Sequence, residues 1–241
     1  MERLVLVHGS VLGGAATWRQ QQPLAERFQL FVVGRPGFPG GPPVERVDFE
    51  RDAELVAGLL EPGDHLVGHS YGGVISLLAA SRGEALGSLT VVEPPATRVA
   101  LDDPAVAAFA AGAEELWSEG PKHDPEAFLR TFLAAVGSDF DPPSPLPSEL
   151  EQGARMLIGE RPPTEAEIPL APLAAAPFPK LVVSGAHHPA FDAICDALER
   201  QLGAERAVLP GYGHSVQRHP DFNAVLADFI DRANRHRAEG A

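Results

Sequence analysis

A serine flanked by glycines is the clearest chemical signal in the chain. The segment Gly68-His69-Ser70-Tyr71-Gly72 follows a short apolar run and leads directly into a second apolar run, residues 73–80. A strand, a tight turn and a helix in this order form a nucleophile elbow, which exposes the serine hydroxyl at the edge of a sheet. Glycine is needed at both flanking positions because a side chain there would clash with neighbouring backbone. Ser70 is therefore predicted to be a nucleophile.

A serine hydroxyl is a weak nucleophile at neutral pH and requires a base within hydrogen-bond reach. Histidine suits this task because its unperturbed pKa, near ~6.5, lies close to neutral. His214 occupies a glycine-containing loop, Gly211-Tyr212-Gly213-His214-Ser215, just after the last predicted strand. Open α/β sheets bind ligands at the carboxyl ends of their strands. We therefore predict that His214 is the base that activates Ser70.

The other histidines are expected to have no catalytic role. His69 is expected to pack beside the nucleophile, and His8 to shape the loop after the first strand. His187 and His188 are adjacent, so they cannot share one face of a helix or strand as metal ligands would. Surface or loop positions are expected for His65, His123, His219 and His236. The spacing of His, Cys, Asp and Glu matches no metal site, and we expect neither a metal nor a cofactor.

Six short apolar runs predict the strands that must position these residues. The runs lie at residues 4–7, 30–33, 65–67, 89–92, 181–183 and 207–209. They are nearly continuous rather than alternating, which is typical of parallel strands covered on both faces. Helical spacing between them, as at residues 49–60 and from Phe222 onward, indicates βαβ units, and the polar tail 232–241 is expected to fray. The predicted fold class is α/β, an open and mostly parallel sheet of about six strands flanked by helices.

Residues 94–179 interrupt this alternation. They contain most of the 24 prolines and no strand-like run, but helices are predicted at 105–117, 125–136 and 148–158, followed by a proline-broken connector, 161–179. Long insertions in compact domains are usually lids or binding loops. We therefore predict a core formed by residues 1–93 and 180–241, with a helical cap of residues 94–179 inserted before the last two strands. The cap aromatic residues are expected to be mainly cap core rather than pocket wall: Phe109, Trp117, Phe128 and Phe132.

Composition and charge limit the partners. The 241 residues are 44% hydrophobic and 22% charged, as in ordinary globular domains. A net charge of −14 repels phosphate backbones and anionic lipid, so neither nucleic acid nor a membrane is expected as a partner. The apolar runs are too short for a membrane span, no leader-like segment is present, and Cys195 is the single cysteine, which together favour the cytoplasm. We expect a small-molecule substrate, and the sequence leaves a homo-oligomer open.

The chain resembles the α/β-hydrolase family over nearly its whole length. Four features have counterparts there: the elbow at Ser70, the opening Val5-Leu6-Val7-His8-Gly9-Ser10 with Trp18 soon after, the place of the insertion, and the loop at His214. The chain starts almost directly on the strand that leads to His8-Gly9, so this is a short version of the fold without the family's first two strands. The resemblance implies a cofactor-free serine hydrolase of the esterase type.

The acid of the expected triad departs from the family pattern. The family usually places an aspartate shortly after the strand that follows the cap, where this chain has Gly185-Ala186-His187-His188. Some members, including certain lipases and haloalkane dehalogenases, carry the acid one strand earlier, at the position of Glu93. Glu93 is preferred because the order Ser70, Glu93, His214 matches the family's order of nucleophile, acid and base. Asp192 is the second candidate, and a site without any acid is the third alternative.

The predicted chemistry is acyl transfer from a small carboxylic ester to water. Ser70 attacks the carbonyl, His214 takes its proton, and Glu93 orients the imidazole. The backbone N–H groups of Tyr71 and Ser10, with Val11 as the alternative to Ser10, are expected to hold the oxyanion. The alternatives are other cofactor-free chemistry of the family, such as perhydrolase, C–C or lactone hydrolase activity, and a decayed site that only binds a ligand.

Overall fold

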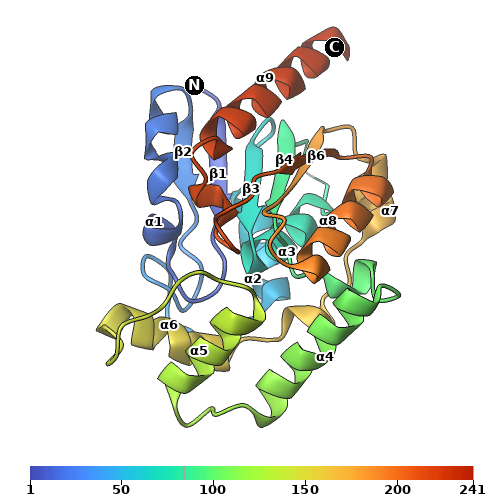
Figure 1. Ribbon diagram of the computed structural model, residues 1–241. Helices are drawn as coiled ribbons and strands as arrows, with labels where there is room; N and C mark the ends of the chain where they lie inside the picture. Colours follow the sequence, from blue (N-terminus) through green and yellow to red (C-terminus); the bar gives the residue numbers. More distant parts are fainter. Residues whose placement is uncertain (84, 241) are drawn as a thin grey trace.

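A six-stranded, fully parallel sheet forms the centre of the computed structural model, which describes residues 1–83 and 85–240 (Figure 1). Its strand order is β2-β1-β3-β4-β5-β6. The strands are β1 (Arg3–Val7), β2 (Gln29–Val32), β3 (His65–His69), β4 (Ser88–Val92), β5 (Lys180–Ser184) and β6 (Glu205–Val208). Each coincides with one of the apolar runs, so the predicted parallel α/β sheet is confirmed.

Helices connect the strands and cover the sheet. The α-helices are α1 (Gly14–Thr17), α2 (Phe49–Leu59), α3 (Tyr71–Ala80), α4 (Pro104–Glu119), α5 (Pro125–Ala135), α6 (Ser148–Ile158), α7 (Leu170–Ala175), α8 (Pro189–Leu202) and α9 (Phe222–Gly240). Short 3₁₀ segments are Arg19–Glu26, Thr97–Val99, Pro163–Glu165 and Val216–Arg218. Asp-Pro pairs begin α4 and α5: the side chains of Asp103 and Asp124 accept hydrogen bonds from first-turn N–H groups, and the proline that follows lacks an N–H to satisfy.

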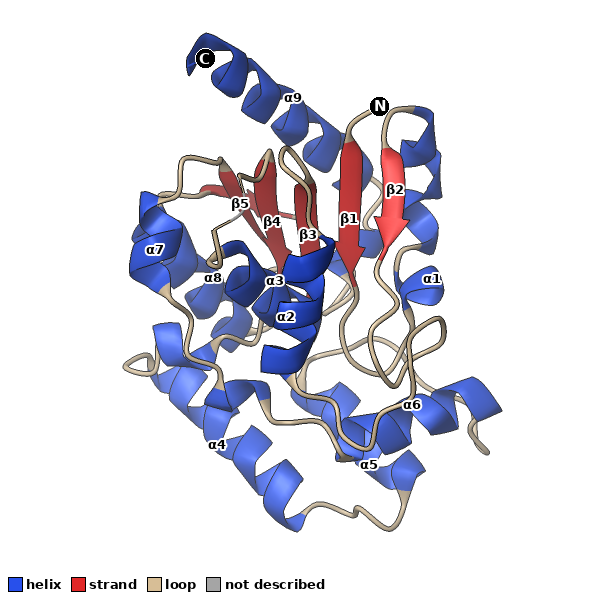
Figure 2. Ribbon diagram, turned by 180° about the vertical axis from the view of Figure 1, so that it is seen from behind, coloured by secondary structure: helices blue, strands red, loops and turns tan. Residues whose placement is uncertain are grey.

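The sheet is apolar on both faces. Along β1, Val5 and Val7 pack into the layer that contains α2, α3 and α8, whereas Leu4 and Leu6 pack into the layer of Trp18 and α9. Figure 2 shows α2 and α3 in front of the strands and α9 behind them. Because successive side chains point to opposite faces, a strand covered on both sides must be apolar throughout. This burial explains why the apolar runs do not alternate with polar residues.

The insertion between β4 and β5 carries α4 to α7. Helices α4, α5 and α6 lie across the carboxyl edge of the strands (Figures 1 and 2), and α7 packs beside α8. The first three share an apolar cluster of their own, formed by Leu116, Phe128, Leu129, Leu150, Ala154 and Leu157. Val11, from the loop after β1, completes this cluster and so joins the insertion to the sheet.

Two local predictions were wrong, and the connector is more regular than its prolines suggested. The tail does not fray: α9 continues to Gly240, and its end is tied to Glu2 by Asn234 (Nδ2 to Oε2, 2.8 Å) and Arg237 (3.4 Å), while residue 241 lies outside the described residues. The connector holds the short helix α7. His65 is fully buried at the start of β3, where its Nδ1 lies 2.9 Å from Oγ of Ser88, its register partner on β4.

Within residues 1–83 and 85–240, every helix falls short of the length and apolar character that a membrane span requires.

Candidate active site

Ser70 occupies a strained turn between β3 and α3. Its φ of 54° lies in the left-handed region, which residues with a side chain rarely adopt. Its backbone N–H donates to the carbonyl of Val92 on β4 (2.8 Å), which ties the turn to the neighbouring strand. Gly72 lies against the carbonyls of Val7 and His8, where a Cβ would not fit. The turn therefore presents the Ser70 hydroxyl at the carboxyl edge of the sheet.

Backbone strain is concentrated at this edge. Among the described residues, the non-glycine residues with positive φ are Val11, Ser70, Glu93 and Ala186. They lie in the loops that follow β1, β3, β4 and β5 respectively. Strain of this kind clusters at functional sites, because the surrounding structure must hold each residue in an unfavourable conformation.

The side chains of Ser70, His214 and Glu93 form a continuous relay. Oγ of Ser70 lies 2.8 Å from Nε2 of His214, and Nδ1 of His214 lies 2.8 Å from Oε2 of Glu93. The carboxylate can only accept a hydrogen bond, so the proton of the imidazole sits on Nδ1 and Nε2 is the acceptor. The backbone N–H of Gly185 donates to the other oxygen, Oε1 of Glu93, at 2.7 Å. The three predicted residues are therefore brought together with the hydrogen bonding that proton transfer from Ser70 requires.

Glu93 is fully buried yet ionised. Burial alone would raise its pKa, but its contacts with His187 and His214 outweigh burial and lower the pKa to about 2. Asp192, the second candidate acid, is engaged elsewhere. It accepts a hydrogen bond from Oγ of Ser184 (2.6 Å) and lies 3.7 Å from the guanidinium of Arg206.

His187 is a member of the site that sequence reasoning missed. Its Nδ1 lies 3.2 Å from Oε1 of Glu93, and its Nε2 lies 3.1 Å from the carbonyl of Val136 at the end of α5. The only signal in the sequence was the missing aspartate, because His187 and His188 stand where the family usually carries it. His188 instead begins α8, with its Nδ1 accepting from the N–H of Ala190.

Glu93, His187 and His214 also form the one cluster of potential metal ligands among the described residues, with one ligand atom each within 4.8 Å of one another. Two of those atoms, Nδ1 of His214 and a carboxylate oxygen, already face each other at hydrogen-bond distance.

Two other predicted histidine roles concern packing around the nucleophile. His8 and His69 are buried, and burial lowers the pKa of each to about 3, so both are neutral at pH 7. Nδ1 of His8 lies 2.9 Å from the carbonyl of Gly9, and Nε2 of His69 lies 2.8 Å from the carbonyl of His214. Cys195 is also buried, and burial raises the pKa of its thiol, which agrees with a packing role.

The loop after β1 lies directly against Ser70. A Cβ built on Gly9 would stand 2.9 Å from Cβ of Ser70. The backbone N–H groups of Ser10, Val11 and Tyr71 have no acceptor among residues 1–83 and 85–240. The side chain of Val11 points into the apolar cluster of α4, α5 and α6. Two free donors beside a nucleophile are what an oxyanion hole requires.

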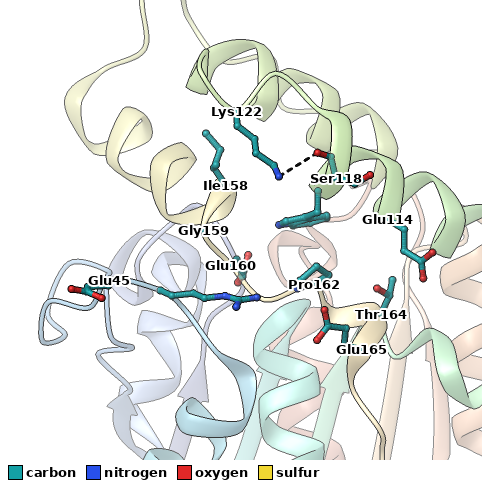
Figure 3. A pocket seen from close by; sticks show the side chains of 12 residues that line it. Glu45, Glu114, Ser118, Lys122, Ile158, Gly159, Glu160, Pro162, Thr164 and Glu165 are labelled. Atoms are coloured by element: carbon teal, nitrogen blue, oxygen red, sulfur yellow. Dashed lines mark hydrogen bonds between the residues drawn. The ribbon is translucent and has the colours of Figure 1, made fainter.

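Two cavities meet at Ser70. The first, about 140 Å³, is lined by polar as well as apolar groups, including His214, Ser215 and Arg218. The second is narrow, about 20 Å³, and its wall is mainly apolar. A wider hollow of about 620 Å³ lies farther out between the insertion and the core, and shares Trp117, Glu160 and Thr164 with the narrow cavity (Figure 3). Neither Ser70 nor His214 lines that outer hollow.

Aromatic side chains of the insertion form much of the narrow cavity. We predicted them to be mainly cap core, but Phe109, Trp117 and Phe132 line the cavity beside Ser70, and of the four only Phe128 is fully enclosed, in the apolar cluster of α4, α5 and α6. Helical spacing marks one apolar face of a helix but does not distinguish a face that packs from one that borders a cavity.

Comparisons with known proteins agree with this arrangement. A model of the alpha/beta hydrolase family matches residues 4–224. A curated relative, pimeloyl-[acyl-carrier protein] methyl ester esterase of Aeromonas hydrophila subsp. hydrophila, is 36% identical over 142 residues, which are 56% of this chain and 55% of the relative. The protein of the same name from Aeromonas salmonicida is 37% identical over 103 residues, 42% of this chain and 41% of the relative. The chain thus matches about half or less of the length of these relatives.

Solved structures share the fold at low sequence identity. MenH from S. aureus superposes with a TM-score of 0.66 and 15% identity, covering 97% of this chain and 94% of that one. A lipase-esterase related protein from Clostridium acetobutylicum superposes with a TM-score of 0.69 and 13% identity, covering 95% of this chain and 93% of that one. A thermophilic esterase from Thermogutta terrifontis, with malate bound, superposes with a TM-score of 0.63 and 21% identity, covering 98% of this chain and 90% of that one.

Proposed function

The chain belongs to the α/β-hydrolase family, and from this premise we propose that it is a serine hydrolase that cleaves a small-molecule carboxylic ester through an acyl-enzyme. Ser70 is the nucleophile, His214 the base and Glu93 the acid. The observation that carries the proposal is the pair of 2.8 Å contacts that link Oγ of Ser70, the imidazole of His214 and the carboxylate of Glu93. The esterase names of the curated relatives support ester hydrolysis as the reaction class.

Acylation begins at the Ser70 hydroxyl. Nε2 of His214 takes the proton as Oγ attacks the ester carbonyl, and the ionised Glu93 stabilises the imidazolium that forms. The oxyanion of the tetrahedral intermediate accepts hydrogen bonds from the N–H groups of Ser10 and Tyr71. His214 then gives its proton to the alcohol oxygen, the C–O bond breaks, and the alcohol leaves. Water attacks the acyl-enzyme by the same route, with His214 again as the base.

The two cavities at Ser70 suggest how the ester lies. His214 must reach the leaving oxygen and lines the polar cavity, so we place the alcohol there. Ser10 and Tyr71 line the narrow cavity, whose apolar wall suits the acyl chain. The curated relatives are named for a methyl ester, and the polar cavity of about 140 Å³ beside His214 has room for a small leaving alcohol. The narrow cavity must widen to admit an acyl group, which requires the aromatic side chains of the insertion to move.

We further propose that residues 94–179 act as a cap on a core formed by residues 1–93 and 180–241. The insertion supplies Phe109, Trp117 and Phe132 to the cavity wall, and none of the three relay side chains. A cap built in this way would select the substrate while the core performs the chemistry.

A fluorophosphonate probe tests the proposal, because it reacts only with an activated serine. The native chain is expected to be labelled and to hydrolyse short p-nitrophenyl esters, and Ser70→Ala is expected to lose both properties. Ser118→Ala, which removes an exposed hydroxyl on α4, is the matched control and should behave like the native chain. A well-folded native chain that is neither labelled nor active would overturn the proposal in favour of a ligand-binding protein.

A further inference from the structure

A buried ionic cluster lies behind the loop that carries the proposed oxyanion donor. It consists of Arg35, Asp52 and Glu160, each at most 2% exposed. The relay of Ser70, His214 and Glu93 does not use these groups. Burying three ionisable side chains is costly unless they are paired or hydrogen-bonded, so their arrangement calls for a physical reason.

Arg35 is bonded to the backbone of this loop. Its Nη1 donates to the carbonyls of His8 (3.0 Å) and Gly9 (2.7 Å), and its Nε donates to Oδ2 of Asp52 (2.8 Å). The Gly9 carbonyl and the Ser10 N–H belong to one planar trans peptide and therefore point in opposite directions. A guanidinium that holds the Gly9 carbonyl thus turns the Ser10 N–H away from Arg35. Gly9 itself abuts Ser70, so the N–H is left on the side available to the reacting carbonyl.

Glu160 holds the same loop from the insertion. Its Oε2 accepts a hydrogen bond from Oγ of Ser10 (2.6 Å), and its Oε1 lies 3.7 Å from Nη2 of Arg35. Glu160 follows α6 and lies at the inner end of the outer hollow (Figure 3). The next residue of the loop, Val11, is packed among α4, α5 and α6. Ser10 is therefore held by the insertion, through Glu160, and by the core, through the bond from Arg35 to the Gly9 carbonyl.

We propose that Arg35 and Glu160 are positioning residues that fix the Gly9–Ser10 peptide, so that the Ser10 N–H is aligned before substrate binds. The inference rests on the proposed function, because it assigns a purpose to the oxyanion hole. It makes the insertion part of the catalytic apparatus: the contact from Glu160 to Ser10 exists only while the insertion is seated on the core.

The protonation state of Glu160 shapes the choice of variants. Burial raises the pKa of Glu160 to about 7, with Arg35 and Ser10 only partly offsetting it. Whether ionised or neutral, Oε2 can accept from Ser10, so the hydrogen bond does not depend on the charge. Glu160→Gln retains an acceptor for Ser10, whereas Glu160→Leu removes it.

The experiment measures kcat and KM for a p-nitrophenyl ester with Glu160→Leu, Glu160→Gln, Ser10→Ala and the double variant of Ser10→Ala with Glu160→Leu. Removing an oxyanion donor costs ~100- to 1000-fold in kcat, and misaligning one should cost about tenfold, with KM changed less than about twofold. Glu160→Gln should keep most of the native kcat. The double variant should be no slower than the worse single variant, because both changes break the same contact.

Arg35→Lys tests the contacts that the core makes with the His8 and Gly9 carbonyls. The three donors of an ammonium project from one nitrogen and cannot reproduce the planar guanidinium, which binds Asp52 through Nε and the two carbonyls through Nη1, so kcat should fall by about tenfold or more. Binding of an alkyl trifluoromethyl ketone, which forms a tetrahedral adduct with an active serine, should weaken in parallel with kcat in Glu160→Leu, Ser10→Ala and Arg35→Lys. Glu149→Leu, an exposed change in the first turn of α6, is the control.

Each outcome decides the inference. Native kcat in both Glu160→Leu and Ser10→Ala, or additive losses in the double variant, would overturn it while leaving the serine hydrolase intact. If Glu160→Leu or Arg35→Lys does not fold, Ser10→Ala still decides, because Ser10 is only partly buried. A native chain that neither hydrolyses esters nor reacts with fluorophosphonate would remove the proposed function and this inference together.

Discussion

Nδ1 of His187 lies 3.2 Å from Oε1 of Glu93, the carboxylate oxygen that does not face His214. Nε2 of the same ring lies 3.1 Å from the carbonyl of Val136. The contact of Nδ1 with Glu93 is an ion-pair distance without hydrogen-bond geometry, whereas the contact of Nε2 with Val136 is a hydrogen bond. The pKa of His187 is raised, which favours the cation, and in that form His187 pairs with Glu93 at the end of β4 while its Nε2 donates to the end of α5.

This link should make stability depend on pH. Burial lowers the pKa of His187, but Glu93 and the Val136 carbonyl outweigh it and raise the pKa above its ordinary value. A raised pKa in the folded state stabilises the fold fully below the unfolded-state pKa of about 6.5, and this contribution is lost as pH rises through the folded-state pKa. The midpoint of urea unfolding should therefore fall as pH increases above about 6.5.

The comparison for His187 is made with three proteins. In His187→Gln this loss of stability should be absent, and His188→Gln should retain it, because His188 has a lowered pKa. His214, His188 and Asp192 are the other titratable groups that act on His187, and all three remain in the His187 variant. An unchanged pH dependence in His187→Gln would contradict the assignment of a cation at this position.

Acid should destabilise the protein through two other histidines. Burial lowers the pKa of His8 and His69 to about 3, so their contribution is complete above the unfolded-state pKa and is lost as pH falls below it. Each takes up one proton on unfolding, which corresponds to about 1.4 kcal/mol per pH unit below pH ~6. Chemical denaturation at pH 6, 5 and 4 gives the free energy of unfolding as a function of pH. In His69→Gln this free energy should fall less steeply with decreasing pH, by about 1.4 kcal/mol per pH unit. Identical slopes would mean that His69 is already protonated in the native protein.

Replacing the acid should separate Glu93 from Asp192. Glu93→Gln keeps the shape of the side chain but presents an amide to His214, which disfavours the required tautomer; kcat should fall by about 10³- to 10⁴-fold. Asp192→Asn, in the first turn of α8, should leave kcat within about threefold of the native value, because Asp192 contacts Ser184 and Arg206 rather than His214. Steady-state hydrolysis of a p-nitrophenyl ester measures both, and the reverse ranking would make Asp192 the acid.

Phe132 should control which acyl chains are accepted. Its side chain lines both cavities at Ser70, so Phe132→Ala joins them and enlarges the narrow one. The ratio of kcat/KM for a p-nitrophenyl octanoate over a p-nitrophenyl acetate should rise by about tenfold. Phe128→Ala is the control, because it leaves a cavity in the apolar cluster of α4, α5 and α6 and not beside Ser70. It should cost about 3–5 kcal/mol of stability and leave the octanoate-to-acetate ratio of kcat/KM unchanged.

The sequence predicted those parts of the site that have a local signature. The elbow at Ser70 needs a strand, glycines and a helix in immediate succession, and all are visible in one short segment. Glu93 was identified as a candidate because some members of the family that the chain resembles carry the acid at the end of this strand, and because the order Ser70, Glu93, His214 matches the family's order.

Contacts between distant segments were beyond the reach of local patterns. Ser10 and Glu160 lie 150 positions apart, and nothing around Glu160 distinguishes it from a solvated glutamate in a proline-rich connector. Arg35 was missed because a buried arginine has no periodicity of its own. The burial of His65 depends on its register with Ser88, which is a property of the assembled sheet.

Two strand ends, those of β4 and β5, approach the same imidazole. Glu93 reaches His214 from the first, and His187, in the loop after the second, stands next to that carboxylate in the region where the resemblance to the family led us to look for an aspartate. The geometry at this edge therefore allows a carboxylate partner for the imidazole to extend from either of two neighbouring strand ends. What the base requires is a carboxylate oxygen opposite Nδ1, and the fold does not tie that oxygen to one strand.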